Sequence, residues 1–282
     1  MYNPEDRLTG KTKGTCLNMN AHDPPFLEFE NVTVFHGEKM VLDSLSLAIR
    51  RGESVAILGP NGAGKSTFIR TIMREFYPVL DRGPVTFRIC GRDTWDVFAL
   101  RSAFGIVSND LQYAFTREIT GREVILSGFF SSIGLFNREI TPEMERRADK
   151  ISAFLEVGHI CNRPMTELSS GEARRFLIGR AMVHDPEVLI LDEPTNSLDL
   201  HALHAFRQTI RKIASNGTAI ILVTHNLQDI IPEIVRVILM KNGSIVGDGP
   251  KEQLLADGPV SRLFDVPVSI RKDDGYYYAT GY

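Results

Sequence analysis

Alternating apolar and polar positions mark the first folded segment of the chain. Residues 26–34 and 45–49 alternate in this way, which predicts two half-buried strands paired antiparallel. A continuous apolar run at 54–58 is instead typical of a strand buried on both faces of a parallel sheet. Further strands are predicted by apolar runs at 85–90, 188–191, 219–223 and 235–240.

Helical patterns fall between these strands. A helix is predicted at about 65–73, and a longer helical spacing extends over about 110–180, where Met144, Ala148, Ile151 and Leu155 recur. Strands that alternate with helices predict an α/β fold, with a mainly parallel sheet and helices on both faces. The long helical stretch interrupts that alternation, so we predict an inserted α-helical lobe at about 110–180. The early alternating strands predict an additional antiparallel β subdomain.

The two ends of the chain differ from this core. Residues 1–25 contain no Val, Ile, Phe or Trp, so they predict a disordered lead-in rather than a secretory signal. Asn242–Gly243 predicts a tight hairpin turn, and Asp274–Gly275 predicts a second one near the C-terminus. We therefore expect a lead-in at 1–25, a folded domain at 26–265 and a C-terminal β-hairpin extension at 266–282.

Composition excludes several classes of protein. The formal net charge of −3 shows no basic excess, so no nucleic-acid partner is expected. No apolar run approaches the roughly 18 residues that cross a bilayer, so contact with a membrane would need a partner. Cys16, Cys90 and Cys161 lie far apart in the sequence, which argues against a disulfide framework and is consistent with a reducing compartment.

A glycine-rich loop follows the buried strand at 54–58 and precedes the first predicted helix. Its residues fit the pattern GxxxxGK[ST]: Gly59, Pro60, Asn61, Gly62, Ala63, Gly64, Lys65, Ser66 and Thr67. Glycines let backbone N–H groups turn inward around phosphate oxygens, and the helix N-terminus adds partial positive charge. Lys65 is predicted to reach the β- and γ-phosphates of a nucleotide, and Ser66 to supply an oxygen to Mg²⁺.

Two acids end the buried strand at 188–191. Asp192 and Glu193 would need a cation or a partner if they were buried, whereas at a solvated strand end they would need neither. The phosphate loop upstream favours the first alternative. Asp192 is then predicted to hold Mg²⁺, and Glu193 to orient or deprotonate an attacking water.

Together with the loop and the acids, three further motifs resemble the ABC ATPase family over nearly the whole chain from Phe26. The segment 168–172, Leu-Ser-Ser-Gly-Glu, is similar to the signature LSGGQ, with Ser170 and Glu172 at the departing positions. The resemblance implies that Ser169, Ser170, Gly171 and Glu172 contact the γ-phosphate of ATP bound to a second subunit. Ser169 and Ser170 are also suited to capping the helix that follows.

The other two motifs follow the paired acids. The segment 194–199 resembles the D-loop, which implies that Asp199 communicates across a dimer. His225 follows the strand at 219–223 and matches the switch histidine, which implies a contact to the γ-phosphate and a role in positioning Glu193. Glu193 and His225 are therefore the predicted catalytic pair.

Two positions depart from the family pattern. Phe35 and His36 stand where the family stacks adenine on a tyrosine, so either ring could stack. Asn109 stands where the family has a glutamine that contacts Mg²⁺, and Gln112 lies three residues further on. Asn109 has the same amide but a shorter reach, so both remain candidates for the metal.

The resemblance implies an ATP- and Mg²⁺-dependent ATPase that pairs with a second copy of itself or a related ABC subunit. It would drive a separate transmembrane permease from the cytoplasmic face of a membrane. The stretch 124–134 is similar to the molybdate-associated ModF-type branch and to siderophore and cobalamin importers, which implies a metal-related or oxyanion substrate.

The alternative is a soluble ABC ATPase acting in repair, regulation or remodelling. The apolar residues of 129–136 either receive a permease helix or form core.

Overall fold

The computed structural model describes residues 24–96, 99–100, 103–108, 115 and 119–281. Within this part of the chain, six strands form the central sheet in the order β5-β6-β7-β3-β8-β9. The strands are β3 (Val55–Leu58), β5 (Phe104–Val107), β6 (Val188–Asp192), β7 (Ala219–Thr224), β8 (Arg236–Lys241) and β9 (Ser244–Pro250). Only the β8–β9 pair is antiparallel, and its turn has positive φ at Asn242 and Gly243, as the sequence predicts.

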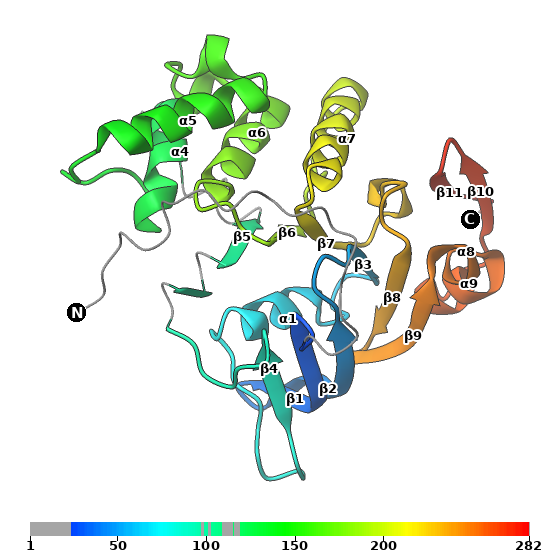
Figure 1. The fold of residues 1–282 in the computed structure, drawn as a ribbon. Helices are drawn as coiled ribbons and strands as arrows, with labels where there is room; N and C mark the ends of the chain where they lie inside the picture. The colour runs from blue at the N-terminus through cyan, green and yellow to red at the C-terminus, as the bar shows by residue number, and fades with distance from the viewer. Residues whose placement is uncertain (1–23, 97–98, 101–102, 109–114, 116–118, 282) are drawn as a thin grey trace.

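A second, antiparallel sheet packs below the first (Figure 1). It consists of β1 (Leu27–His36), β2 (Lys39–Ile49) and β4 (Thr86–Ile89), with β1 in the centre. Its aromatic residues interlock with the core of the central sheet. Phe29 lies edge-on to Phe68 of helix α1, and Phe26 lies edge-on to Phe104 of β5. These contacts fix the antiparallel subdomain against α1, which begins at the phosphate loop.

Helices cover both faces of the central sheet. Helix α1 (Lys65–Ile72) lies on the same side as the antiparallel sheet (Figure 1). The other face is covered by α4 (Gly121–Ser127), α5 (Pro142–Phe154), α6 (Ser170–Ala181) and α7 (Leu200–Ser215). The fully buried strand β3 separates two cores, with Val55 and Ile57 in one and Ala56 and Leu58 in the other. This arrangement is the α/β fold that the strand and helix patterns predict.

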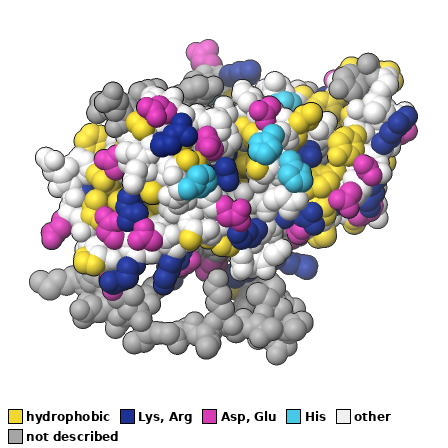
Figure 2. Space-filling model, turned by 90° about the horizontal axis from the view of Figure 1, so that it is seen from above, with side chains coloured by type: hydrophobic (Ala, Val, Ile, Leu, Met, Phe, Trp, Pro, Cys, Tyr) yellow, Lys and Arg dark blue, Asp and Glu magenta, His cyan; other side chains and the backbone are white. Residues whose placement is uncertain are grey.

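Polar side chains cap the N-termini of α4, α5 and α6, the helices that form the lobe. Thr120 with Glu123 and Ser169 with Glu172 form reciprocal capping boxes at α4 and α6, and the Thr141 side chain caps α5. Short 3₁₀ turns connect these elements at η2 (Gly128–Phe130), η3 (Gly158–Ile160) and η4 (Met165–Glu167). From above, the described surface mixes basic and acidic side chains (Figure 2), in keeping with the small net charge.

The C-terminal segment forms two short helices and a separate two-stranded hairpin. After α8 (Lys251–Leu254) and α9 (Asp257–Phe264), the chain forms the hairpin β10 (Ser269–Asp273) and β11 (Tyr276–Thr280). The two strands are joined at Asp274 and Gly275, which have positive φ, at the turn that the sequence predicts. The Tyr276 ring packs under the Arg207 guanidinium of α7, at 4.5 Å, and the hairpin contacts the 3₁₀ turn η5 (Leu227–Asp229). The hairpin therefore supports the segment that directly follows His225.

The apolar residues of 129–136 differ in burial, so only some of them belong to the core. Phe129 and Leu135 pack against the core of the lobe. Ile133 and Phe136 instead remain 45% and 66% exposed. In the described part of the chain, no helix combines the length and the apolar character that a membrane span needs.

Candidate nucleotide-binding and hydrolysis site

The glycine-rich loop connects β3 to α1 at the carboxyl edge of the central sheet. Gly62 and Gly64 have φ of +79° and +101°, which side chains rarely adopt. A Cβ at Gly59 would lie 2.1 Å from the carbonyl oxygen of Met240, so only glycine fits there. Gly64 precedes the first turn of α1 and has no side chain to cap it. The first N–H groups of α1 therefore suit an anion such as a phosphate.

Lys65 is turned back into this loop. Its ammonium group donates to the carbonyl oxygens of Gly59 at 2.7 Å and Pro60 at 3.0 Å, and only 6% of the side chain is exposed. The same nitrogen lies 3.2 Å from a carboxylate oxygen of Glu193. The lysine thus joins the phosphate loop directly to the acid at the end of β6.

Glu193 and His225 are brought together by neighbouring strands. Because β6 pairs with β7, and β7 with β3, the loops that carry Lys65, Glu193 and His225 emerge side by side. His225 Nδ1 and Glu193 Oε2 are 2.5 Å apart. Glu193 has a positive φ of +49°, and its N–H donates to the carbonyl of Val223 at 2.8 Å. The structure therefore brings together the two residues predicted to act on water.

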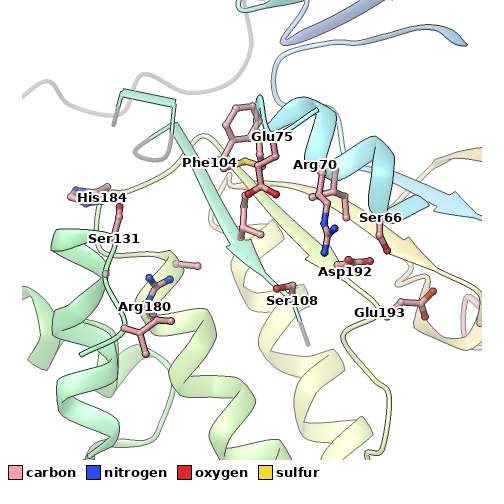
Figure 3. A pocket seen from close by; sticks show the side chains of 16 residues that line it. Ser66, Arg70, Glu75, Phe104, Ser108, Ser131, Arg180, His184, Asp192 and Glu193 are labelled. Carbon is pink, nitrogen blue, oxygen red and sulfur yellow. The ribbon is translucent and has the colours of Figure 1, made fainter. Parts of the chain in front are cut away.

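Ser66 and Asp192 line one cavity of about 530 Å³, whose lining also includes Glu193. On one side of this cavity the side chains of Ser66, Arg70 and Asp192 converge (Figure 3). A hydroxyl and a carboxylate beside a phosphate loop are the oxygen donors that Mg²⁺ uses together with nucleotide phosphates, so these residues fit that ion. Asn109 and Gln112 lie outside the described residues. Ser108, just before them, lines the same cavity.

The signature residues occupy the start of α6. Ser169 caps the helix, and Ser169 and Ser170 are exposed. The Glu172 carboxylate accepts from the Ser169 N–H at 2.8 Å and from its hydroxyl at 2.7 Å, and these bonds lower its pKa. Glu172 is therefore engaged in its own helix cap. The sequence Ser-x-x-Glu gives that signal in advance.

The start of α7 adjoins the signature helix. Asp199 caps α7 by accepting from the Ala202 N–H at 2.7 Å. A Cβ added at Gly171 would lie 2.8 Å from the Cβ of Ala202, so the two helix starts are in close contact. The starts of α6 and α7, which carry predicted signature and D-loop residues, thus lie in direct contact. A movement of either helix start would therefore displace the other.

The two candidate adenine-stacking rings have different surroundings. His36 is exposed, and its ring lies edge-on to Phe76 at 5.4 Å. Phe35 is half-buried, with the Arg82 guanidinium 5.3 Å from its ring. The exposed imidazole, backed by an aromatic ring, is thus the more accessible platform for a base.

The chain is similar to known proteins in sequence and in fold. A profile of the ABC transporter family matches residues 42–196. An uncharacterised ABC transporter ATP-binding protein of Bacillus subtilis, YlmA, is 33% identical over 86% of this chain and 92% of its own length. The hemin import ATP-binding protein HmuV of Rhodopseudomonas palustris is 32% identical over 89% of this chain and 92% of its own. The Nod factor export ATP-binding protein I of Rhizobium johnstonii is 32% identical, over 83% and 72%.

The chain is also similar to a protein whose structure was solved as a dimer. The ATP-binding cassette MJ0796, determined as a dimer in a post-hydrolysis state with ADP and Pi, is 26% identical, with a TM-score of 0.63. The match covers 79% of this chain and 98% of the MJ0796 chain. The fold and the phosphate loop define a P-loop nucleotide-binding ATPase. Within that class, the chain belongs to the ABC transporter family as an ATP-binding subunit, which confirms the predicted fold class.

Proposed function

We propose that this chain energises an ABC importer by binding ATP between two copies of itself and driving a separate transmembrane permease. The observation that carries this proposal is the cavity that contains Ser66, Asp192 and Glu193. Its lining also includes the lobe residues Gly128, Ser131 and Ile133. Figure 3 shows Ser131 on the side of the cavity away from Ser66 and Asp192, so one cavity extends from these residues to the lobe. A permease segment that docks at this part of the lobe would therefore lie beside the cavity that Ser66, Asp192 and Glu193 line.

The residues at the site have separable roles in the proposed reaction. The loop 59–67 holds the phosphates through Lys65 and through backbone N–H groups, which Pro60 lacks. Ser66 and Asp192 would hold Mg²⁺, together with Asn109 or Gln112, and the ion would supply charge to offset that of the phosphates. Glu193 accepts a proton from the attacking water, while His225 orients the Glu193 carboxylate. His36 or Phe35 stacks on the adenine.

A second copy completes each site in this proposal. The signature residues Ser169, Ser170 and Gly171, of which the two serines are exposed, would face the γ-phosphate on the partner chain, and Asp199 would transmit its state. The likeness to a dimeric cassette holding ADP and Pi supports this pairing. Glu172 would act by holding the signature helix start in shape, since its carboxylate is bonded to Ser169.

The proposed cargo is a metal-related compound or an oxyanion. Support comes from the similarity of 124–134 to ModF-type and siderophore-type importers and from the likeness to a hemin import protein. The likeness to a Nod factor export protein makes the direction of transport a point for experiment. In this proposal the subunit lies at the cytoplasmic face of the membrane, held there by its permease.

The permease is best sought with an ATP-locked form of the subunit. The Glu193→Gln variant with ATP is incubated with detergent-solubilised membranes and with the soluble fraction of the source cell. We expect it to retain a protein with many membrane spans. Adding Phe136→Glu, at an exposed apolar position on the lobe, should abolish that retention. Adding Leu80→Glu, at an exposed apolar position of the loop between α1 and β4, serves as the matched control and should leave retention intact.

The outcomes separate the two functional classes. Retention of a multi-spanning protein that depends on Phe136 supports transport through the lobe surface. Retention of soluble proteins alone, from either fraction, contradicts the transporter proposal. It would support instead a soluble ABC ATPase acting in repair, regulation or remodelling.

A further inference from the structure

A buried carboxylate lies directly behind the Glu193–His225 pair. Asp229 ends the turn η5, four residues after His225, and is only 4% exposed. Burial raises the pKa of its carboxyl group, and the nearby charge of Glu193 raises it further. Placing an acid here is costly for the fold, because a carboxylate loses hydration when it is buried. The position therefore calls for an explanation.

Asp229 connects two loops through its two oxygens. One oxygen accepts from the Thr195 hydroxyl at 2.7 Å, and the other accepts from the Thr224 hydroxyl at 2.5 Å. Thr195 stands two residues after Glu193, and Thr224 stands one residue before His225. A single side chain thus holds the loop of each member of the pair.

The turn that carries Asp229 is itself fixed from two sides. Just before the turn, the Thr224 hydroxyl at the end of β7 accepts from the Asn226 N–H at 2.9 Å, so the hydroxyl is oriented to donate to Asp229. From behind, the Arg207 guanidinium donates to the carbonyl of Gln228 at 2.5 Å and lies over the ring of Tyr276. We call the two hydrogen bonds from Thr195 and Thr224 to Asp229 the Asp229 bridge. The contacts of Arg207 hold the turn that carries this bridge in place.

We propose that Asp229 is a positioning residue that sets the Glu193–His225 geometry by tying the loop after β6 to the end of β7. The inference rests on the proposed roles of Glu193 and His225 in hydrolysis. It predicts an effect on turnover and not on ATP binding, because Asp229 bonds to the loops of the pair and not to the phosphate loop. The bridge works only while both of its arms are intact.

Isosteric substitutions test the two hydrogen bonds of the bridge, one from Thr195 and one from Thr224. Thr195→Val and Thr224→Val each remove one hydroxyl and keep the side-chain shape. Each should lower kcat about tenfold, the loss that follows from one charge-assisted hydrogen bond, with ATP affinity within about twofold of the parent. The double variant should be no slower than the slower single variant, because one lost arm already breaks the bridge. Thr209→Val is the control, since that hydroxyl donates to the carbonyl of Ala205 in its own helix at 2.9 Å.

Substitutions at Asp229 test the centre of the bridge. Asp229→Asn should retain most of kcat, because the amide can accept from Thr224 and donate to Thr195. Asp229→Ala should lose at least as much kcat as either threonine variant. If Asp229→Ala does not fold, the threonine variants decide the question.

Three results would overturn the inference: an unchanged kcat in both single variants, losses that multiply to about a hundredfold in the double variant, or ATP affinity that falls in parallel with kcat. Glu193→Gln is measured alongside. If it hydrolyses ATP normally, the proposed site is wrong. If it is inactive while the threonine variants are normal, only the role of Asp229 is wrong.

Discussion

Replacing Glu193 with glutamine tests the site at the point where its contacts meet. The carboxylate lies 3.2 Å from the Lys65 ammonium with one oxygen and 2.5 Å from His225 with the other, and its side chain is 15% exposed. Glutamine keeps the shape and can still accept a hydrogen bond from Lys65. It cannot accept the proton of an attacking water. The substitution therefore removes a base and a charge while leaving the fold intact.

The expected loss of turnover follows from the role of a general base. Such a group contributes about 10²- to 10⁴-fold to a rate. At about 1.36 kcal/mol for each tenfold, this raises the barrier by roughly 3 to 5 kcal/mol. A fall in kcat of this size, without loss of folded protein, is the expected result.

The expected effect on ATP affinity has the opposite sign. Two unit charges 3.2 Å apart attract by about 5 kcal/mol at an effective dielectric constant of about 20. Most of this is offset by the desolvation of both groups, and the amide replaces part of the contact. A net release of about 1 kcal/mol makes Lys65 easier to transfer to a phosphate. The affinity for ATP should then rise about fivefold.

The assay combines steady-state ATPase kinetics, equilibrium binding of ATP and size-exclusion chromatography with and without ATP. The variant should turn over slowly, bind ATP at least as tightly as the parent and accumulate as a dimer. Glu187→Gln is the matched control, because Glu187 precedes the opposite end of β6 and pairs at the surface with Arg51. Normal turnover in Glu193→Gln would refute the assignment of the base, and weaker ATP binding would refute the competition for Lys65.

Three further substitutions address the neighbouring motifs. Lys65→Ala should weaken ATP binding at least tenfold in equilibrium titrations, because the phosphates lose their cation, and an unchanged affinity would count against the phosphate loop. Ser170→Trp should leave ATP binding to the monomer intact and abolish hydrolysis, whereas loss of monomer binding would contradict a site shared between two chains. Glu172→Gln should flatten the pH dependence of the melting temperature in acid. The Ser169 bonds lower the pKa of Glu172, so their stabilisation is present above about pH 4.3 and is lost as the pH falls through the lowered pKa.

Local patterns were sufficient to predict the parts of the fold that depend on neighbouring residues. The phosphate loop combines an apolar strand, glycines that permit positive φ and a following helix, and all three signals lie within about twenty residues. The same is true of the Asn242–Gly243 turn. The pairing of Glu193 with His225 was predictable only through the family resemblance, because it depends on β6 and β7 being neighbours in the sheet.

Other features depend on tertiary packing and gave weaker signals. Strand β5 is only four residues long and was not predicted, although Gly105 fits there because a Cβ would lie 2.7 Å from the carbonyl of Ala181. Asp229 was not predicted either, since an acid in a polar stretch gives no sign of burial. Its partners Thr195 and Thr224 come from separate loops, so only the folded chain brings the three residues together.

The contacts of Lys65 connect ATP binding to the readiness of the base. The ammonium group has three donors, and its contacts are the carbonyls of Gly59 and Pro60 and the carboxylate of Glu193. Phosphate oxygens that arrive at the loop compete for the same donors. We therefore expect nucleotide binding to draw Lys65 away from Glu193 and, in the proposed mechanism, to leave that carboxylate to His225 and the attacking water. In the proposed mechanism, the contact with Lys65 holds the Glu193 carboxylate until a phosphate reaches the loop.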